Sequence, residues 1–396
     1  MRCESVAIPV GGAWSSPFAR WQGPLKDDSS LDVAVAVTRA ALAERAFDPA
    51  RLTGFVLGMT VPQLGAFYAP STVATGIGAP QISGPLVVQA CATSVKALQS
   101  AAAETEGAGG TSLVVLTDRT SNGPHVIYPG DSGIGGRVAR EDIPLDAFAA
   151  DPLTGLSMLE TAEAVAEEAG FSRSQLDELT ALRYAQYESS LADDRAFQRR
   201  YMVPVELERR RGPALRVEED HGVRSTTLAD LTRLAPTRPD GTLTGGTQTH
   251  PADGAAGMLV TDPATAKELG RDGAVARVLA FGNARAEAAR MPKAPVPAAL
   301  QALERAGLGA GQVDLVVTHN PFAVNDLWLA RELGFDQEQV NPKGCSLVYG
   351  HPQGPTGARG IAELIEALAD RGGGTGLFTG CAAGDTGAAV LLRVEG

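Results

Sequence analysis

The sequence contains one motif twice, and this internal repeat limits the folds that the chain can adopt. Residues 41–59 read ALAERAFDPARLTGFVLGM, and residues 301–319 read QALERAGLGAGQVDLVVTH. Arg45 and Arg305 occupy equivalent places in the two copies and lie 260 residues apart. The repeat therefore predicts two similar halves related by pseudo-symmetry.

Each copy has the pattern of an α/β unit. Apolar residues spaced by three and four predict a helix over 31–46 in the first copy and over 295–306 in the second. Short apolar runs follow, FVLGM at 55–59 and LVVTH at 315–319, as expected for strands buried on both faces of a sheet. We therefore predict an α/β fold with two halves rich in βαβ units.

Cys91 and His351 are also separated by the repeat offset of 260 residues. Each follows a strand-like run and precedes a helix rich in small residues, which suits burial between two sheets. The N-terminus of a helix exposes free N–H groups and a partial positive charge, which lower the pKa of a thiol and can hold an oxyanion. Cys91 could instead fill a small buried space, but its place opposite a histidine favours a reactive thiol.

A different stretch, at about 121–248, separates the two copies. It is rich in glycine and proline and contains charged helical runs at 161–193 and 224–235. A long insertion on one loop is tolerated and often builds a binding site. We therefore predict an N-terminal half that carries the nucleophile (1–120), a loop domain over the pocket (121–248) and a C-terminal half that carries the base residues (249–396).

Composition argues against several classes of partner and location. The net charge of −12 disfavours nucleic acid or anionic lipid as the main partner. No stretch approaches 18 uninterrupted apolar residues, and the first residues lack the pattern of a secretory signal. The four cysteines form no CxxC pair, so neither a disulfide framework nor a metal site is expected. We expect a cytoplasmic protein that does not bind membranes.

Six motifs, in order along nearly the whole chain, resemble those of the thiolase family. They read VVQACATSVKALQS, SMLETAEAVAEEAG, DGTLTGGTQTHPADGAAGMLV, HNPF, GHPQGPTGARG and GLFTGCAAGDTGAAVLL. Each is weak alone, but six in the family's order are a strong signal. The resemblance implies a layered thiolase fold with two pseudo-symmetric halves, mixed five-stranded sheets, central helices and an inserted loop domain.

The resemblance also implies a reaction and its residues. The expected activity is that of a thiolase-type acyltransferase, which forms or cleaves 3-ketoacyl-CoA thioesters by reversible Claisen condensation through an acyl-cysteine. Cys91 would be the nucleophile, His351 would accept its proton, and Cys381 would be the second base. His319 of the HNPF box would share one oxyanion site with His351, and the backbone amides of Cys91 and Ala383 would form the other.

Coenzyme A and its acyl thioesters are the partners that the resemblance implies, with no metal and no resident cofactor. Arg224 matches a family position that contacts the adenosine end, Thr249 one that lines the pantetheine channel, and Met158 one that lines the acyl pocket. A solvated surface charge for Arg224 and a place in the loop-domain core for Met158 are the alternatives. The resemblance further implies a homodimer or a dimer of dimers.

Some positions depart from the commonest family pattern. His319 stands where asparagine is usual, as in the HDCF box of sterol-carrier-type thiolases, and Ala383 and Leu159 stand where glycine is common. Leu159 would narrow the pocket. These changes leave the acyl chain and the acceptor open.

Three other functions remain as alternatives. One is an acyltransferase of specialised metabolism with the same nucleophile and an acceptor other than CoA. Another is a non-catalytic thiolase-like protein that binds acyl-CoA. The third, a decarboxylating ketosynthase, is disfavoured because the GHP histidine and the GC cysteine occur together. The retention of Cys91, His351, Cys381 and a polar His319 favours catalysis.

Overall fold

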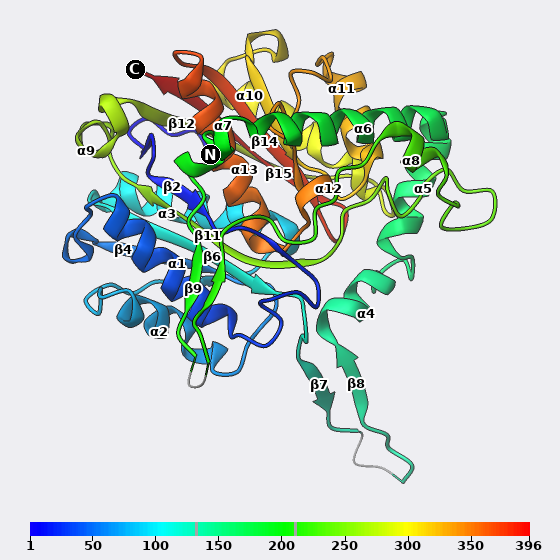
Figure 1. The fold of residues 1–396 in the computed structure, drawn as a ribbon, viewed down its shortest axis with the longest axis horizontal. Coiled ribbons are helices and arrows are strands. Elements are labelled where there is room, and N and C mark those ends of the chain that lie inside the picture. Colours follow the sequence, from blue (N-terminus) through cyan, green and yellow to red (C-terminus); the bar gives the residue numbers. More distant parts are fainter. Residues whose placement is uncertain (131–133, 210–211) are drawn as a thin grey trace.

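The computed structural model describes residues 1–130, 134–209 and 212–396, and two mixed β-sheets form its body (Figure 1). The C-terminal sheet has the order β1 (Ala7–Pro9), β12 (Val275–Arg285), β15 (Thr386–Glu395), β14 (Gly374–Ala382) and β13 (Leu315–His319). The N-terminal sheet has the order β2 (Ala13–Ser15), β11 (Ala252–Val260), β6 (Ser112–Arg119), β4 (Gly54–Gly58) and β5 (Leu86–Val87). The short β3 (Ala19–Arg20) also pairs with β11, so the N-terminal sheet has one strand beyond the expected five.

Strand pairing confirms the pseudo-symmetry predicted from the repeat. In the N-terminal sheet β4 is parallel to β6, β6 is antiparallel to β11, and β11 is antiparallel to β2. In the C-terminal sheet β13 is parallel to β14, β14 is antiparallel to β15, and β15 is antiparallel to β12. The two sheets therefore repeat one order and one set of strand directions.

Helices form three layers around these sheets. The two central helices, α3 (Thr93–Ala108) and α13 (Gly354–Asp370), pack on each other between the sheets. Helices α1 (Ser30–Glu44) and α2 (Ala69–Gly76) cover the outer face of the N-terminal sheet, while α10 (Pro295–Ala306) and α11 (Ala323–Leu333) cover that of the C-terminal sheet. The small α9 (Pro263–Leu269) and α12 (Ser346–Tyr349) lie in connections. The predicted layered α/β fold is confirmed.

Side-chain alternation along the strands explains this layering. In β4, Phe55 and Leu57 pack in the cluster under α1, whereas Val56 packs in the central cluster with α3. Such alternation gives each strand two buried faces. In α13, a Cβ atom on Gly360 would lie 2.7 Å from the Phe378 ring of β14, so only glycine lets the helix approach the sheet this closely.

The loop domain carries the remaining elements. These are the hairpins β7 (His125–Tyr128)/β8 (Ala139–Asp142) and β9 (Val205–Leu207)/β10 (Leu215–Val217), with α4 (Ile143–Ala149), α5 (Met158–Ala169), α6 (Arg173–Ser190), α7 (Ala192–Arg195) and α8 (Leu228–Thr232). Capping boxes start α5 and α6, and Gly170, with φ +68°, separates them, so the first predicted helical run is two helices. The second run contains only the short α8. Figure 1 shows the β7/β8 hairpin projecting from the body.

The sheets do not follow the predicted chain divisions at 120 and 248. Strand β11 lies in the predicted C-terminal segment but pairs with β6 in the N-terminal sheet, and β1 lies in the N-terminal segment but pairs with β12. The repeat could not indicate this exchange, because it aligns helices and strands without giving their partners. Among the described residues, no helix combines the length and apolarity needed to span a bilayer.

Candidate active site

Cys91 lies in a tight turn that leads into α3. The turn is a 3₁₀ segment over Ala90–Ala92, and Ala90 has φ +42°, a left-handed conformation that is costly for a residue with a side chain. Thr93 stabilises the turn, because its hydroxyl donates to the Ala90 carbonyl at 2.7 Å and accepts from the backbone N–H of Gln89 at 2.8 Å. The turn therefore fixes the sulfur at the start of a central helix.

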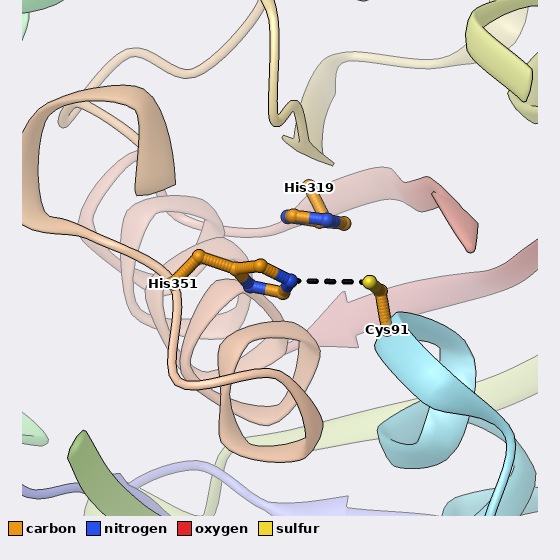
Figure 2. A group of neighbouring side chains, drawn as sticks. All are labelled: Cys91, His319 and His351. Carbon is orange, nitrogen blue, oxygen red and sulfur yellow. Dashed lines mark hydrogen bonds between the residues drawn. The ribbon is translucent and has the colours of Figure 1, made fainter. Parts of the chain in front are cut away.

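His351 meets Cys91 from the other half of the repeat (Figure 2). Its Nε2 lies 3.1 Å from the Cys91 sulfur. Its Nδ1 lies 2.6 Å from the hydroxyl of Thr356 in α13. With the proton on Nδ1 donated to Thr356, Nε2 is free to accept the thiol proton. The pair thus has the geometry of a nucleophile and its base.

His319, at the end of β13, stacks on His351. The ring centroids are 4.0 Å apart and the planes are inclined by 23°. The Nδ1 atom lies 3.2 Å from the hydroxyl of Ser346, whereas the buried Nε2 has no hydrogen-bond partner among the described residues. A buried ring nitrogen without a hydrogen-bond partner is costly, so the Nε2 atom is suited to bind a polar atom of a ligand.

Cys381 lies at the end of β14, which packs against the turn that carries Cys91. Its buried sulfur accepts a hydrogen bond from the side-chain amide of Asn325 at 3.3 Å. Burial raises the pKa of Cys381 well above its usual value, the nearby Cys91 raises it further, and the Asn325 contact lowers it. Cys381 is therefore a neutral thiol in the resting site.

Burial also keeps Cys91 and His351 neutral. It raises the pKa of the Cys91 thiol to about 12, against the opposing effect of backbone N–H groups at Ala383 and Cys91. Burial lowers the pKa of His351 well below 6.5 and that of His319 to about 3. An uncharged thiol beside an uncharged imidazole is thus the resting form. The same two N–H groups are the donors predicted for an oxyanion site.

A pocket of about 400 Å³ opens onto Cys91 and His351. Of the predicted contact residues, Met158 and Thr249 line it, and the Thr249 hydroxyl donates to the Ser346 carbonyl at 2.5 Å. Leu159 also lines the pocket, and α4 contributes an apolar wall made of Ile143, Pro144, Ala147 and Phe148. Arg224 is exposed outside this lining.

The ligand atoms of Cys91, His319 and His351 lie within 4.8 Å of one another, which places the donor types of a zinc site together. However, Cys91 and His351 already share a hydrogen bond and face a substrate-sized pocket. This arrangement suits proton transfer from an attacking thiol, so we assign the group to acyl chemistry.

Three residues of the site were not identified from the sequence. Asn325 contacts Cys381, Gln353 lies 3.2 Å from the Cys91 sulfur through its side-chain oxygen, and the buried Asp118 anchors the segments on both sides of the pocket. Asn325 follows the HNPF motif and Gln353 lies within GHPQGPTGARG, so these motifs could have indicated both residues. Asp118 lies near the end of an ordinary apolar strand pattern, and the sequence around it did not indicate a role in the site.

Comparisons with known proteins agree with this geometry. The model of the thiolase N-terminal domain matches residues 8–264, and that of the thiolase C-terminal domain matches residues 273–394. The chain belongs to the thiolase family. A probable acetyl-CoA acetyltransferase of Mycobacterium tuberculosis is 31% identical, with 98% of this chain and 99% of the relative covered. This membership confirms the prediction of a thiolase-type acyltransferase.

Solved thiolase structures share the fold over nearly the full chain. Human mitochondrial 3-ketoacyl-CoA thiolase superposes with a TM-score of 0.88 at 26% identity, with 98% of each chain covered. A structure of the same human thiolase in complex with CoA gives a TM-score of 0.87, also at 26% identity and 98% coverage of each chain. The acetyl-CoA acetyltransferase of Bacillus anthracis gives 0.88 at 25% identity, with 99% of each chain covered.

Proposed function

We propose that this thiolase is an acetyl-CoA C-acyltransferase that forms and cleaves short-chain 3-ketoacyl-CoA thioesters. The observation that carries the proposal is the 3.1 Å contact between Cys91 and His351, with Cys381 on the neighbouring strand. One histidine-activated thiol and a second thiol provide the two proton-transfer groups that a Claisen condensation needs. The names of the relatives, which are acetyl-CoA acetyltransferases and a 3-ketoacyl-CoA thiolase, support the same reaction.

In the first half-reaction Cys91 takes the acyl group. His351 accepts the thiol proton, the sulfur attacks the thioester carbonyl, and the tetrahedral oxyanion is held by the backbone N–H groups of Cys91 and Ala383. The intermediate collapses to an acyl-cysteine, and CoA leaves with the proton held by His351. Because the resting pair is neutral, attack on the carbonyl and proton transfer are coupled.

In the second half-reaction Cys381 first gives its thiol proton to His351, which is free again once CoA has left. The Cys381 thiolate then removes a proton from the α-carbon of a second acyl-CoA. The enolate oxygen is held near the stacked histidines, where the unpaired Nε2 of His319 supplies a polar partner. The carbanion then attacks the acyl-cysteine, a carbon–carbon bond forms as the carbon–sulfur bond breaks, and His351 returns its proton to the Cys91 thiolate. Thiolysis of the 3-ketoacyl product follows the same steps in reverse.

Coenzyme A would enter along the pocket wall made by the loop domain. Thr249 would line the pantetheine channel, Met158 the acyl end, and Arg224, at the surface, the adenosine end. CoA is a substrate in this reaction, so the proposal includes no metal and no resident cofactor. A cytoplasmic location fits cysteines that are all free thiols.

The test is cleavage of acetoacetyl-CoA by free CoA in wild type, Cys91→Ala and Cys381→Ala. We expect turnover in wild type and at least a roughly 1,000-fold loss of kcat in either variant, since each removes a group that forms or transfers a bond. Thr249→Val, which keeps the shape of the pocket wall, should mainly raise KM. Wild-type turnover that survives Cys91→Ala would contradict the proposal. Inactivity on acetoacetyl-CoA, with turnover on longer thioesters, would correct only the chain length.

We further propose that the enzyme forms a homodimer through the edge of the N-terminal sheet. Strand β5 is an edge strand, and Leu86 on it and Val88 next to it are exposed. Leu64, Phe67 and Tyr68 are exposed in the connection between β4 and α2. An exposed apolar sheet edge invites pairing with a second chain. Light scattering should give a dimer mass for wild type and a lower mass for Val88→Lys. A wild-type monomer at micromolar concentration would contradict this proposal.

A further inference from the structure

Gln353 contacts the reacting sulfur, and the reaction described above assigns it no role. Its side-chain oxygen lies 3.2 Å from the Cys91 sulfur, and its side chain is buried against the pocket that opens onto this sulfur. Cys91 therefore has two polar side-chain partners, His351 and Gln353, which both come from the segment that leads into α13.

The backbone of Gln353 is strained in a way that fixes this contact. It has φ +59° and ψ −108°, in the region that favours glycine. The next residue holds it there, because the Gly354 amide donates to Asp118 at 2.8 Å and a Cβ atom on Gly354 would lie 2.8 Å from the same carboxylate. A costly backbone conformation that aims a side chain at a nucleophile indicates a functional position.

A carboxamide can form a hydrogen bond with the Cys91 sulfur both when the sulfur is a thiol and when it is a thiolate. Its oxygen is a second possible acceptor for the single S–H proton of the resting thiol, beside His351 Nε2. When its terminal torsion rotates by half a turn, its N–H group faces the same point and can donate to a thiolate. A hydrocarbon side chain could do neither, and a carboxylate would repel the thiolate.

The thiolate needs such a donor because its surroundings are buried. Among the described residues, the titratable groups around it are His351, His319, Cys381 and Asp118, and of these four His351 alone hydrogen-bonds the sulfur. The backbone amides of Cys91 and Ala383 also face the sulfur but are needed for the oxyanion once the acyl carbonyl is bound. A side-chain donor separate from these amides would remain available during attack.

We propose that Gln353 is a further catalytic residue, whose side-chain N–H donates to the Cys91 thiolate while His351 holds the transferred proton. Gln353 forms no bond to the substrate and takes no proton. It stabilises the charge-separated pair relative to the neutral thiol and imidazole. The inference rests on Cys91 being the nucleophile of the proposed reaction.

The test measures the thiolate directly, without any acyl substrate. The rate of Cys91 alkylation by iodoacetamide is followed by peptide mass spectrometry from pH 6 to pH 10 in wild type, Gln353→Leu and Gln353→Glu. We expect Gln353→Leu to slow alkylation at pH 7.5 by roughly 10- to 100-fold, because a charge-assisted hydrogen bond is lost. Gln353→Glu should slow it further, and both profiles should shift to higher pH. Gln81→Leu, the same change at a glutamine outside the pocket whose side chain donates to the Pro49 and Leu52 carbonyls, should keep the wild-type alkylation rate.

Two outcomes would overturn the inference. One is a wild-type alkylation rate, within about twofold, in folded Gln353→Leu and Gln353→Glu. The other is faster alkylation in Gln353→Leu, which would mean that Gln353 holds the proton on the thiol. If Gln353→Leu does not fold, Gln353→Gly removes the amide and also relieves the backbone strain, and it should show the same loss.

The two proposals can fail separately. If wild type cleaves no 3-ketoacyl-CoA but alkylation still depends on Gln353, the proposed reaction is wrong and the thiolate contact stands. If Cys91-dependent cleavage proceeds and the alkylation rate does not change in the Gln353 variants, only this inference is wrong.

Discussion

Single residues set the charge state of the site, and His319 illustrates how burial does so. Its ring is buried and stacks on His351, and its Nε2 has no hydrogen-bond partner in the part of the chain that the structure describes. Burial lowers the pKa of His319 to about 3, from 6.5 for an exposed histidine. The folded protein therefore keeps this ring neutral at pH values where the unfolded chain protonates it.

This difference predicts a loss of stability in acid. The unfolded state gains a proton as the pH falls below about 6.5, whereas folded His319 gains one only near pH 3, so folding weakens between these values. In urea unfolding, wild type should lose about 2 kcal/mol more than His319→Asn between pH 7 and pH 5. His125→Asn, at an exposed histidine, is the matched control and should behave as wild type. Equal losses in wild type and His319→Asn would contradict this account.

At the scale of elements, Asp118 connects strand β6 to both sides of the pocket. Its carboxylate accepts from the Thr60 amide and hydroxyl at 2.7 and 2.8 Å, from the Val61 amide at 2.7 Å and from the Gly354 amide at 2.8 Å. Thr60 and Val61 line the pocket, and Gly354 starts α13. One buried side chain therefore positions a pocket wall and the start of a central helix.

Asp118→Asn should damage both stability and activity. An amide offers one oxygen where the carboxylate offers two, so at least one buried N–H loses its acceptor, at about 1–3 kcal/mol each. We expect a lower Tm and a kcat reduced by roughly tenfold or more, as the start of α13 shifts relative to Cys91. Asp253→Asn, at a buried carboxylate that accepts from the Ser121 amide, should lower Tm with little effect on kcat. Unchanged kcat in Asp118→Asn would contradict the positioning role.

At the scale of the whole molecule, a buried charge network joins the loop domain to α13. Arg359 of α13 donates to both oxygens of Asp220, at 2.6 and 2.8 Å, and to Glu363 at 2.9 Å. The guanidinium lies over the Tyr349 ring, 3.6 Å from its centroid, and Tyr201 donates to Glu363 at 2.7 Å. Because Asp220 and Tyr201 belong to the loop domain, this network fixes the insertion on the central helix.

Arg359→Met should therefore weaken the whole fold. It leaves the carboxylates of Asp220 and Glu363 buried without their cation, which costs about 3–5 kcal/mol of unfolding free energy. Urea unfolding measures this loss. Arg216→Met, in an exposed pair with Glu206, is the control and should cost less than about 1 kcal/mol. A loss below about 1 kcal/mol in Arg359→Met would contradict the structural role of the network.

The repeat predicted the two halves, their strands and the meeting of Cys91 with His351, because duplicated local patterns survive in the sequence. It did not predict that β11 and β1 exchange sheets, since strand partners depend on long-range closure. The partners of Arg359, Asn325 and Gln353 were equally hidden. Burial and contact at these positions arise from segments that are far apart in the chain, so a nearby motif marked the region without giving the partner.

In the proposed reaction Cys91 carries the acyl group, and Cys381 acts only in the second half-reaction. Incubation with acetyl-CoA, followed by acid quenching and peptide mass spectrometry, tests it most directly. We predict an acetyl group on Cys91 in wild type and in Cys381→Ala, none in Cys91→Ala, and acetoacetyl-CoA formed by wild type alone. An acetyl group on Cys381 but not on Cys91, or no acyl-enzyme with any thioester tested, would contradict the account.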